Sequence, residues 1–189
     1  SVVLGADLKG NVTVPELAGA TIAINGNGHT FDGTFALVGG STYGEGTTIF
    51  ENIAFETAAL NGYDAFIYCN EQNGNTRYPD NVTIKNCTFT AKDAAVKKTV
   101  AAKFWALNGK LVVEGCEANG LHSLMQVTSS ENANVVVDGV KVANGKNGIS
   151  LQYTGGTISK TTIKADEYGV RADGSKTTLN IVESTIEAK

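Results

Sequence analysis

A six-residue pattern recurs along most of this chain, and it limits the fold more strongly than any other feature of the sequence. The pattern reads apolar, polar, turn, apolar, polar, apolar. Its instances are FENIAF from Phe50, IKNCTF from Ile84, VEGCEA from Val113, VDGVKV from Val137, ISKTTI from Ile158 and IVESTI from Ile181. Successive instances start 34, 29, 24, 21 and 23 residues apart, which indicates one basic repeat lengthened in places by insertions.

The turn position of the pattern predicts a tight corner between two short strands. In successive repeats this position holds Asn52, Asn86, Gly115 and Gly139. Asn and Gly adopt left-handed backbone geometry more easily than other residues, and a tight corner requires that geometry. The last two repeats offer Thr161 and Glu183 instead, so we expect the corner to loosen or change type there.

Alternation of apolar and polar residues on both sides of the corner indicates strands that send every second side chain into one core. Another strand-like piece follows each pattern: AFIYC from Ala65, AKFWA from Ala102, SLMQV from Ser123, GISLQ from Gly148 and GVRA from Gly169. Each repeat thus supplies about three short strands. Coils stacked about 4.8 Å apart would pair each strand with its neighbours above and below. The sequence therefore predicts an all-β solenoid of parallel strands in a single domain, residues 1–189.

The phrases NVTIKNCTF, TTIFENIAF and AINGNGHTFDG resemble coils of the right-handed parallel β-helix found in pectin-lyase-like proteins. The resemblance covers most of the chain and implies about seven coils. The same scaffold serves polysaccharide lyases, hydrolases, adhesins, autotransporters and phage tailspikes, so the resemblance implies a fold and not one activity. It implies an origin in a secreted or surface protein of a bacterium or a phage.

Both ends of the sequence indicate a domain excised from a longer chain. It begins with Ser in a strand-like pattern and stops at LNIVESTIEAK, inside a repeat. An open coil exposes unpaired backbone groups. We therefore expect missing sequence, another subunit or unidentified residues to cover the C-terminal edge, and VVLGADLKGNVTVPEL to form an irregular first coil that acts as a lid.

Charge and composition exclude several classes of partner. The net charge is −4 and the chain has only two arginines, Arg77 and Arg171, so we do not expect it to bind nucleic acid. No apolar run reaches the roughly 18 residues needed to span a membrane. The three cysteines form no CxxC pair, so we expect neither a zinc site nor any other metal or cofactor. Cys87 and Cys116 follow the corner in consecutive repeats and are expected to stack in the core.

Candidate ligand-binding residues lie on the second strand row. If its apolar members point inward, period 2 turns Tyr68, Lys103, Trp105, Gln126, Ser150, Gln152 and Arg171 outward. Two insertions, Asn70 to Asp80 with Arg77 and Tyr78, and Ala91 to Val100, would form the walls of a groove, with His122 at its edge. The predicted binding set is Tyr68, Arg77, Tyr78, Lys103, Trp105, His122, Gln126, Gln152 and Arg171. If the register is shifted by one, Tyr68 and Trp105 belong to the core instead.

Three functions remain open at this point. Planar rings beside hydrogen-bonding groups suit sugars, so the leading hypothesis is a non-catalytic, adhesin-like module that binds carbohydrate or another surface ligand outside the cell or on a virion. The alternative is a structural domain that assembles fibres or particle surfaces, self-associating through its open coil ends. The third is a polysaccharide lyase or glycoside hydrolase, which would need acids such as Glu71 or Asp80. The outward row contains no cluster of acids, so the chain is predicted to be non-catalytic.

Overall fold

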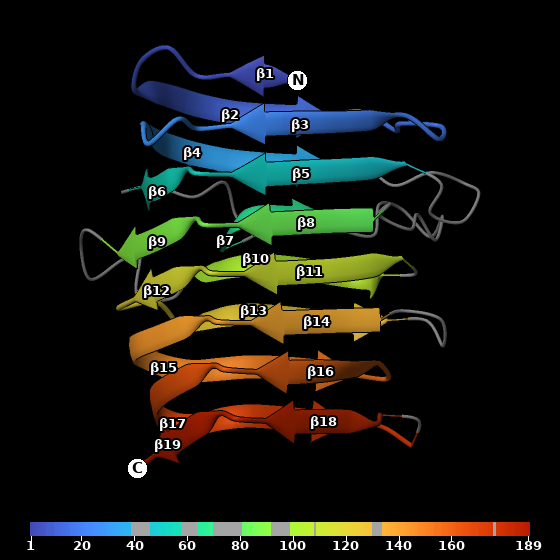
Figure 1. Ribbon diagram of the computed structural model, residues 1–189, viewed down its shortest axis with the longest axis vertical. Helices are drawn as coiled ribbons and strands as arrows, with labels where there is room; N and C mark the ends of the chain where they lie inside the picture. Colours follow the sequence, from blue (N-terminus) through green and yellow to red (C-terminus); the bar gives the residue numbers. More distant parts are fainter. Residues whose placement is uncertain are drawn as a thin grey trace.

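A computed structural model describes residues 1–38, 46–57, 64–69, 81–91, 99–107, 109–129, 134–175 and 177–189. Over these residues the chain is all-β, with 72% strand and no helix. Its coils stack into a parallel β-solenoid of about six turns, with the two ends of the chain at opposite ends of the stack (Figure 1). The predicted fold class is therefore confirmed.

One wall of the solenoid is an eight-stranded parallel sheet whose strands come from successive levels of the stack. Because each strand hydrogen-bonds to the equivalent strand of the next coil, the spatial order follows the sequence (Figure 1). The strands, in spatial order, are β1 (Val2–Val3), β3 (Thr21–Asn25), β5 (Thr47–Glu51), β8 (Asn81–Lys85), β11 (Lys110–Glu114), β14 (Asn134–Asp138), β16 (Gly155–Ser159) and β18 (Leu179–Val182).

The other walls belong to one eleven-stranded sheet that is folded around a corner. Its first part contains β6 (Ala54–Thr57), β9 (Thr88–Ala91), β12 (Glu117–Asn119) and β19 (Thr185–Ala188). Its second part contains β7 (Ala65–Cys69), β10 (Val100–Leu107) and β13 (Ser123–Ser129). The longer strands β2 (Leu8–Val14), β4 (Thr30–Leu37), β15 (Lys141–Gln152) and β17 (Thr162–Asp173) complete it. Strand β4 joins the two parts, because it pairs with β6 at one end and with β7 at the other.

Stacked apolar side chains fill the space between the walls. Phe31, Phe55 and Phe89 occupy matching positions in three consecutive coils, and all three are buried. The Phe55 and Phe89 rings lie parallel, with centroids 4.8 Å apart and 5° between their planes. This separation matches the coil spacing, so the in-register repeat stacks Phe55 on Phe89, whereas Phe31 meets Phe55 edge-on with centroids 6.1 Å apart.

The corner residues adopt the predicted left-handed backbone. Their φ angles are 55° at Asn52, 51° at Asn86, 60° at Gly115 and 61° at Gly139. Each donates its backbone N–H to the carbonyl that precedes the corner in the next coil, for example Asn86 to Glu114 at 2.9 Å. The four residues therefore form one column along the solenoid.

The last two corners require a correction. Lys160, not Thr161, is the corner residue of its coil, with φ of 47°, and Glu183 follows with φ of 49°. The corner neither loosens nor changes type, because Lys160 still donates its N–H to the carbonyl of Val182 at 3.1 Å. Thr161 occupies the next position and is buried.

The residue after the corner is buried in five successive coils, from Ile53 to Thr161. Cys87 and Cys116 stack there as predicted, and both are buried free thiols. Each thiol bonds the carbonyl two residues earlier, as Thr161 Oγ1 does with Ser159 at 2.8 Å. The Cys87 N–H donates to Cys116 Sγ at 3.4 Å. A hydrogen bond with Cys116 and burial both raise the pKa of the Cys87 thiol.

In the terminal coils, apolar side chains at inward positions are exposed. Segment 2–14 forms the first coil through β1 and β2, as predicted, but Val2 and Leu8 are exposed although their partners Ile24 and Phe31 are buried. At the other end Ile181 is 45% exposed. The repeats predicted about seven coils; the last contributes only β18 and β19 here, and the solenoid makes about six turns.

Candidate functional site

A row of polar and aromatic side chains follows the outer face of the second part of the folded sheet. Tyr68, Lys103, Gln126, Ser150 and Arg171 are cross-strand neighbours in consecutive coils of β7, β10, β13, β15 and β17. The residues that precede them are core residues or pack against the core. The row therefore faces outward, as the period-2 pattern predicts.

Trp105 lies outside the core, with 46% of its surface exposed. It follows the buried Phe104 on β10, in the stretch where the pairing of β10 with β13 is irregular. Tyr68 is half-buried on the outward row. The alternative register, which would put both residues in the core, is wrong.

A shallow depression of about 240 Å³ brings part of this face together. Four of the predicted residues line it: Trp105, Gln126, Gln152 and Arg171. The remaining lining residues are Val127, Thr128, Ser150, Tyr168 and Asp173. The depression therefore combines two aromatic rings, two side-chain amides, two aliphatic hydroxyls and one pair of opposite charges.

Three contacts connect side chains that line the depression. Arg171 Nε lies 2.6 Å from Asp173 Oδ2. The Arg171 guanidinium carbon lies 5.9 Å from the centroid of the Tyr168 ring, within the range of a cation–π contact. Thr128 Oγ1 donates to Gln152 Oε1 at 3.3 Å, which leaves the amide nitrogen of Gln152 as a donor.

The other predicted residues lie elsewhere. Tyr68 and Lys103 continue the row beyond the depression and do not line it. His122 immediately precedes β13, and its Nε2 lies 3.3 Å from Asn147 Nδ2. Burial, reinforced by Lys146, lowers the pKa of His122. Arg77 and Tyr78 lie outside the described residues, as do most of the two insertions expected to form the walls of the groove.

Five lining residues were absent from the predicted binding set: Val127, Thr128, Ser150, Tyr168 and Asp173. Thr128 could have been found, because it follows Gln126 by two residues on the same strand. Tyr168 stands three residues before Arg171, so period 2 does not place it on the row. It pairs with Asn147 across a region where the register of β15 and β17 shifts. A bulge of this kind redirects side chains in ways that simple alternation does not predict.

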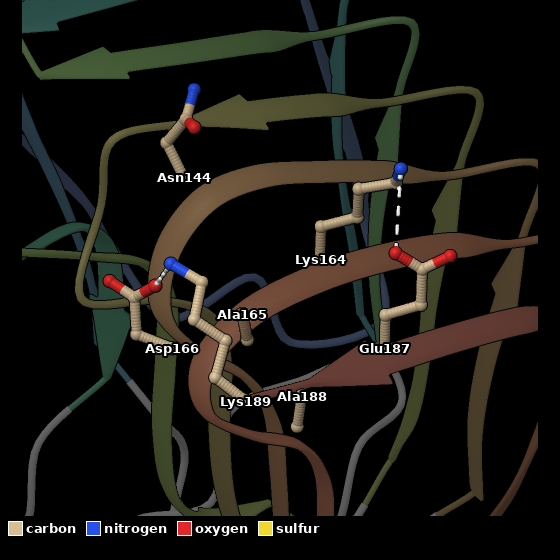
Figure 2. Close-up of a pocket in the computed structure, with 7 residues that line it drawn as sticks. All are labelled: Asn144, Lys164, Ala165, Asp166, Glu187, Ala188 and Lys189. Atoms are coloured by element: carbon tan, nitrogen blue, oxygen red, sulfur yellow. Dashed lines mark hydrogen bonds and ion pairs between the residues drawn. The ribbon is translucent and has the colours of Figure 1, made fainter.

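A second, larger hollow of about 340 Å³ lies at the C-terminal end of the solenoid (Figure 2). Two ion pairs line it: Lys164 with Glu187 at 3.4 Å, and Lys189 with Asp166 at 2.9 Å. The bond to Asp166 raises the pKa of Lys189. In Figure 2 these charged groups point toward one another. The lining contains no aromatic ring, so this hollow is less suited to a sugar than the depression beside Trp105.

Among the described residues that line the depression, acidic groups are few. Asp173 is the one carboxylate in its lining, and Arg171 binds it. Hydrolysis of a glycosidic bond by the common mechanisms requires two carboxyl groups roughly 5 to 9.5 Å apart. Within the described part of the chain, no group of three or more His, Cys, Asp or Glu residues is placed to hold a metal ion.

Comparison with known proteins found no matching family model, no similar curated protein and no similar solved structure. The class that the coordinates define is thus a parallel β-solenoid with an aromatic and polar depression on one wall. The described residues contain no helix that is long and apolar enough to span a membrane.

Proposed function

We propose that this chain is a non-catalytic carbohydrate-binding module of the adhesin type, exposed outside the cell or on a virion. The observation that carries the proposal is the exposed Trp105 in a depression lined by amides and hydroxyls. Sugar rings stack their apolar faces on aromatic side chains, and their hydroxyls need both donors and acceptors around them. Gln126 and Gln152 can supply both.

The shape of the wall also supports a glycan as the ligand. Equivalent side chains of neighbouring coils stand about 4.8 Å apart, so the row offers repeated contacts to an extended chain. The resemblance of NVTIKNCTF and related phrases to pectin-lyase-like coils agrees with this proposal and remains an expectation. The single carboxylate in the lining favours binding without cleavage.

Trp105 makes the proposal directly testable, because it is the only tryptophan in the chain. A glycan that stacks on the indole should change its fluorescence, and calorimetry should give a matching affinity. We expect Trp105→Ala to abolish binding and Trp105→Phe to restore part of it. Lys110→Ala, on the opposite sheet, is the control and should bind normally. Absence of binding across a broad glycan array would refute the proposal.

A second candidate function is self-association through the coil ends. Val2, Val3, Leu8 and Val12 at one end, and Ile181 and Val182 at the other, are exposed apolar residues. The strands run parallel throughout, so the first coil of one copy presents the polarity that the last coil of another copy needs. Light scattering of the 189-residue chain at increasing concentration should then show growing species that Ile181→Lys eliminates. A concentration-independent monomer would refute this candidate.

A further inference from the structure

The charged groups in the depression cancel each other. Its lining contains one cation, Arg171, and one anion, Asp173, in contact at 2.6 Å. Both side chains remain accessible, with exposed fractions of 58% and 42%. Lys103 neighbours Gln126 in the row but does not line the depression. A ligand here therefore meets no net charge from the lining.

The Arg171–Asp173 pair can still both donate and accept hydrogen bonds. A guanidinium has five N–H donors, and the contact between Arg171 Nε and Asp173 Oδ2 uses one of them. The Asp173 carboxylate has a second oxygen that can accept. Two neighbouring sugar hydroxyls each donate and accept, so a diol can bond the donor and the acceptor of this pair together.

An acidic sugar fits the same place poorly. Its carboxylate only accepts hydrogen bonds, and it would face the Asp173 carboxylate, a like charge that disfavours it. To use Arg171 fully, it would have to displace Asp173 from the guanidinium. The other polar lining residues, Gln126, Thr128, Ser150 and Gln152, are uncharged.

We infer that the ligand of this depression is an uncharged glycan, and that the Arg171–Asp173 pair excludes uronic-acid glycans. This inference rests on the proposed function, since it specifies the class of carbohydrate. Asp173 becomes a specificity-determining residue: it holds Arg171 in a neutral pair and accepts from a ligand hydroxyl.

The test compares neutral and uronate oligosaccharides of equal length by Trp105 fluorescence, at low and at moderate salt. For the unmodified chain we expect neutral oligosaccharides to bind at least about tenfold more tightly, with little dependence on salt, because screening acts on charged ligands. Asp173→Asn should weaken neutral binding and strengthen uronate binding about tenfold, because it leaves Arg171 without its carboxylate partner. The new uronate binding should weaken as salt is added.

Two controls separate specificity from general damage. The contacts of Asp173 with Tyr153 and Thr177 use its backbone carbonyl, so Asp173→Asn should leave the fold intact, which circular dichroism checks. Lys110→Gln removes a cation on β11, away from the outward row, and should leave the preference unchanged. Tighter uronate binding by the unmodified chain, or an unchanged preference in a folded Asp173→Asn, would overturn the inference alone. Failure of both glycan classes to bind would overturn the proposed function as well.

Discussion

Replacing Gly139 by alanine should destabilise the solenoid through the backbone alone. Gly139 has φ of 61°, and a Cβ added there would meet no atom closer than the Gly115 nitrogen at 4.0 Å. The added methyl therefore causes no collision. Left-handed geometry costs an L-residue about 1–2 kcal/mol, and the reduced freedom of the unfolded chain offsets about 0.4–1 kcal/mol of this. We expect a net loss of about 1 kcal/mol in the free energy of unfolding.

The matched change at Lys160 should act in the opposite direction. Lys160 occupies the same corner with φ of 47°, and Asn tolerates this region better than Lys does. Lys160→Asn should therefore stabilise the fold by about 0.5 kcal/mol or more. In a chain of 189 residues, 1 kcal/mol corresponds to roughly 2–4 °C in the melting temperature.

Urea unfolding and thermal melting, both followed by circular dichroism, measure these differences. The comparison requires equal urea m-values in the three proteins, since a changed m-value signals altered cooperativity. The two substitutions are expected to change the free energy of unfolding in opposite directions. A general destabilisation by mutation would therefore not reproduce both results. If Gly139→Ala is neutral, or if Lys160→Asn destabilises as much as Gly139→Ala, backbone strain at the corner does not explain the choice of residues there.

Four further predictions concern the core and the titratable groups. Phe89→Ala should cost about 3–5 kcal/mol in unfolding free energy, because the buried ring stacks on Phe55; denaturant unfolding measures the loss. Gly148→Ala should cost about 1–3 kcal/mol or prevent folding, since its Cβ would lie 2.1 Å from a backbone oxygen. The pKa of His122 is lowered from its ordinary 6.5, so the folded state binds a proton at His122 less readily than the unfolded state does. The free energy of unfolding should therefore fall as the pH drops below 6.5. In His122→Gln this dependence of the unfolding free energy on pH should be weaker. Cys87 should react with a thiol reagent only after unfolding, because it is buried and its pKa is raised; rapid labelling of the folded chain would contradict this.

The fold could be predicted from the sequence because its determinants are local and repeated. Alternation sets which side chains face inward, and Asn52, Asn86, Gly115 and Gly139 mark the corners by residue type. Lys160 has the wrong type for such a corner, so a search by residue preference misplaces it. The bond from its N–H to Val182 in the next coil holds it there, which shows tertiary pairing overriding local preference.

The site could be predicted only in part. Gln126, Gln152 and Arg171 lie on regular strand pairings, so period 2 gives their direction correctly. Period 2 also gives the outward direction of Trp105 correctly, although the pairing of β10 with β13 is irregular there; Tyr168, which borders a register shift in β17, is not predicted. The direction of a side chain at such an irregularity depends on the local kink and not on the alternation. The contribution of Tyr168 to the lining is therefore the part that simple alternation does not predict.

The outward row carries little of the fold, and this makes its composition informative. Core phenylalanines and left-handed corners define the coils, whereas any polar residue of good strand propensity would serve at the position of Trp105. Nearly half of the Trp105 surface is exposed, so this ring contributes less to the core than a fully buried aromatic residue does. The amides and the paired charges beside it leave the ring accessible without surrounding it by other apolar groups. An exposed aromatic ring within a polar, charge-balanced depression is the observation on which the proposed sugar-binding function rests.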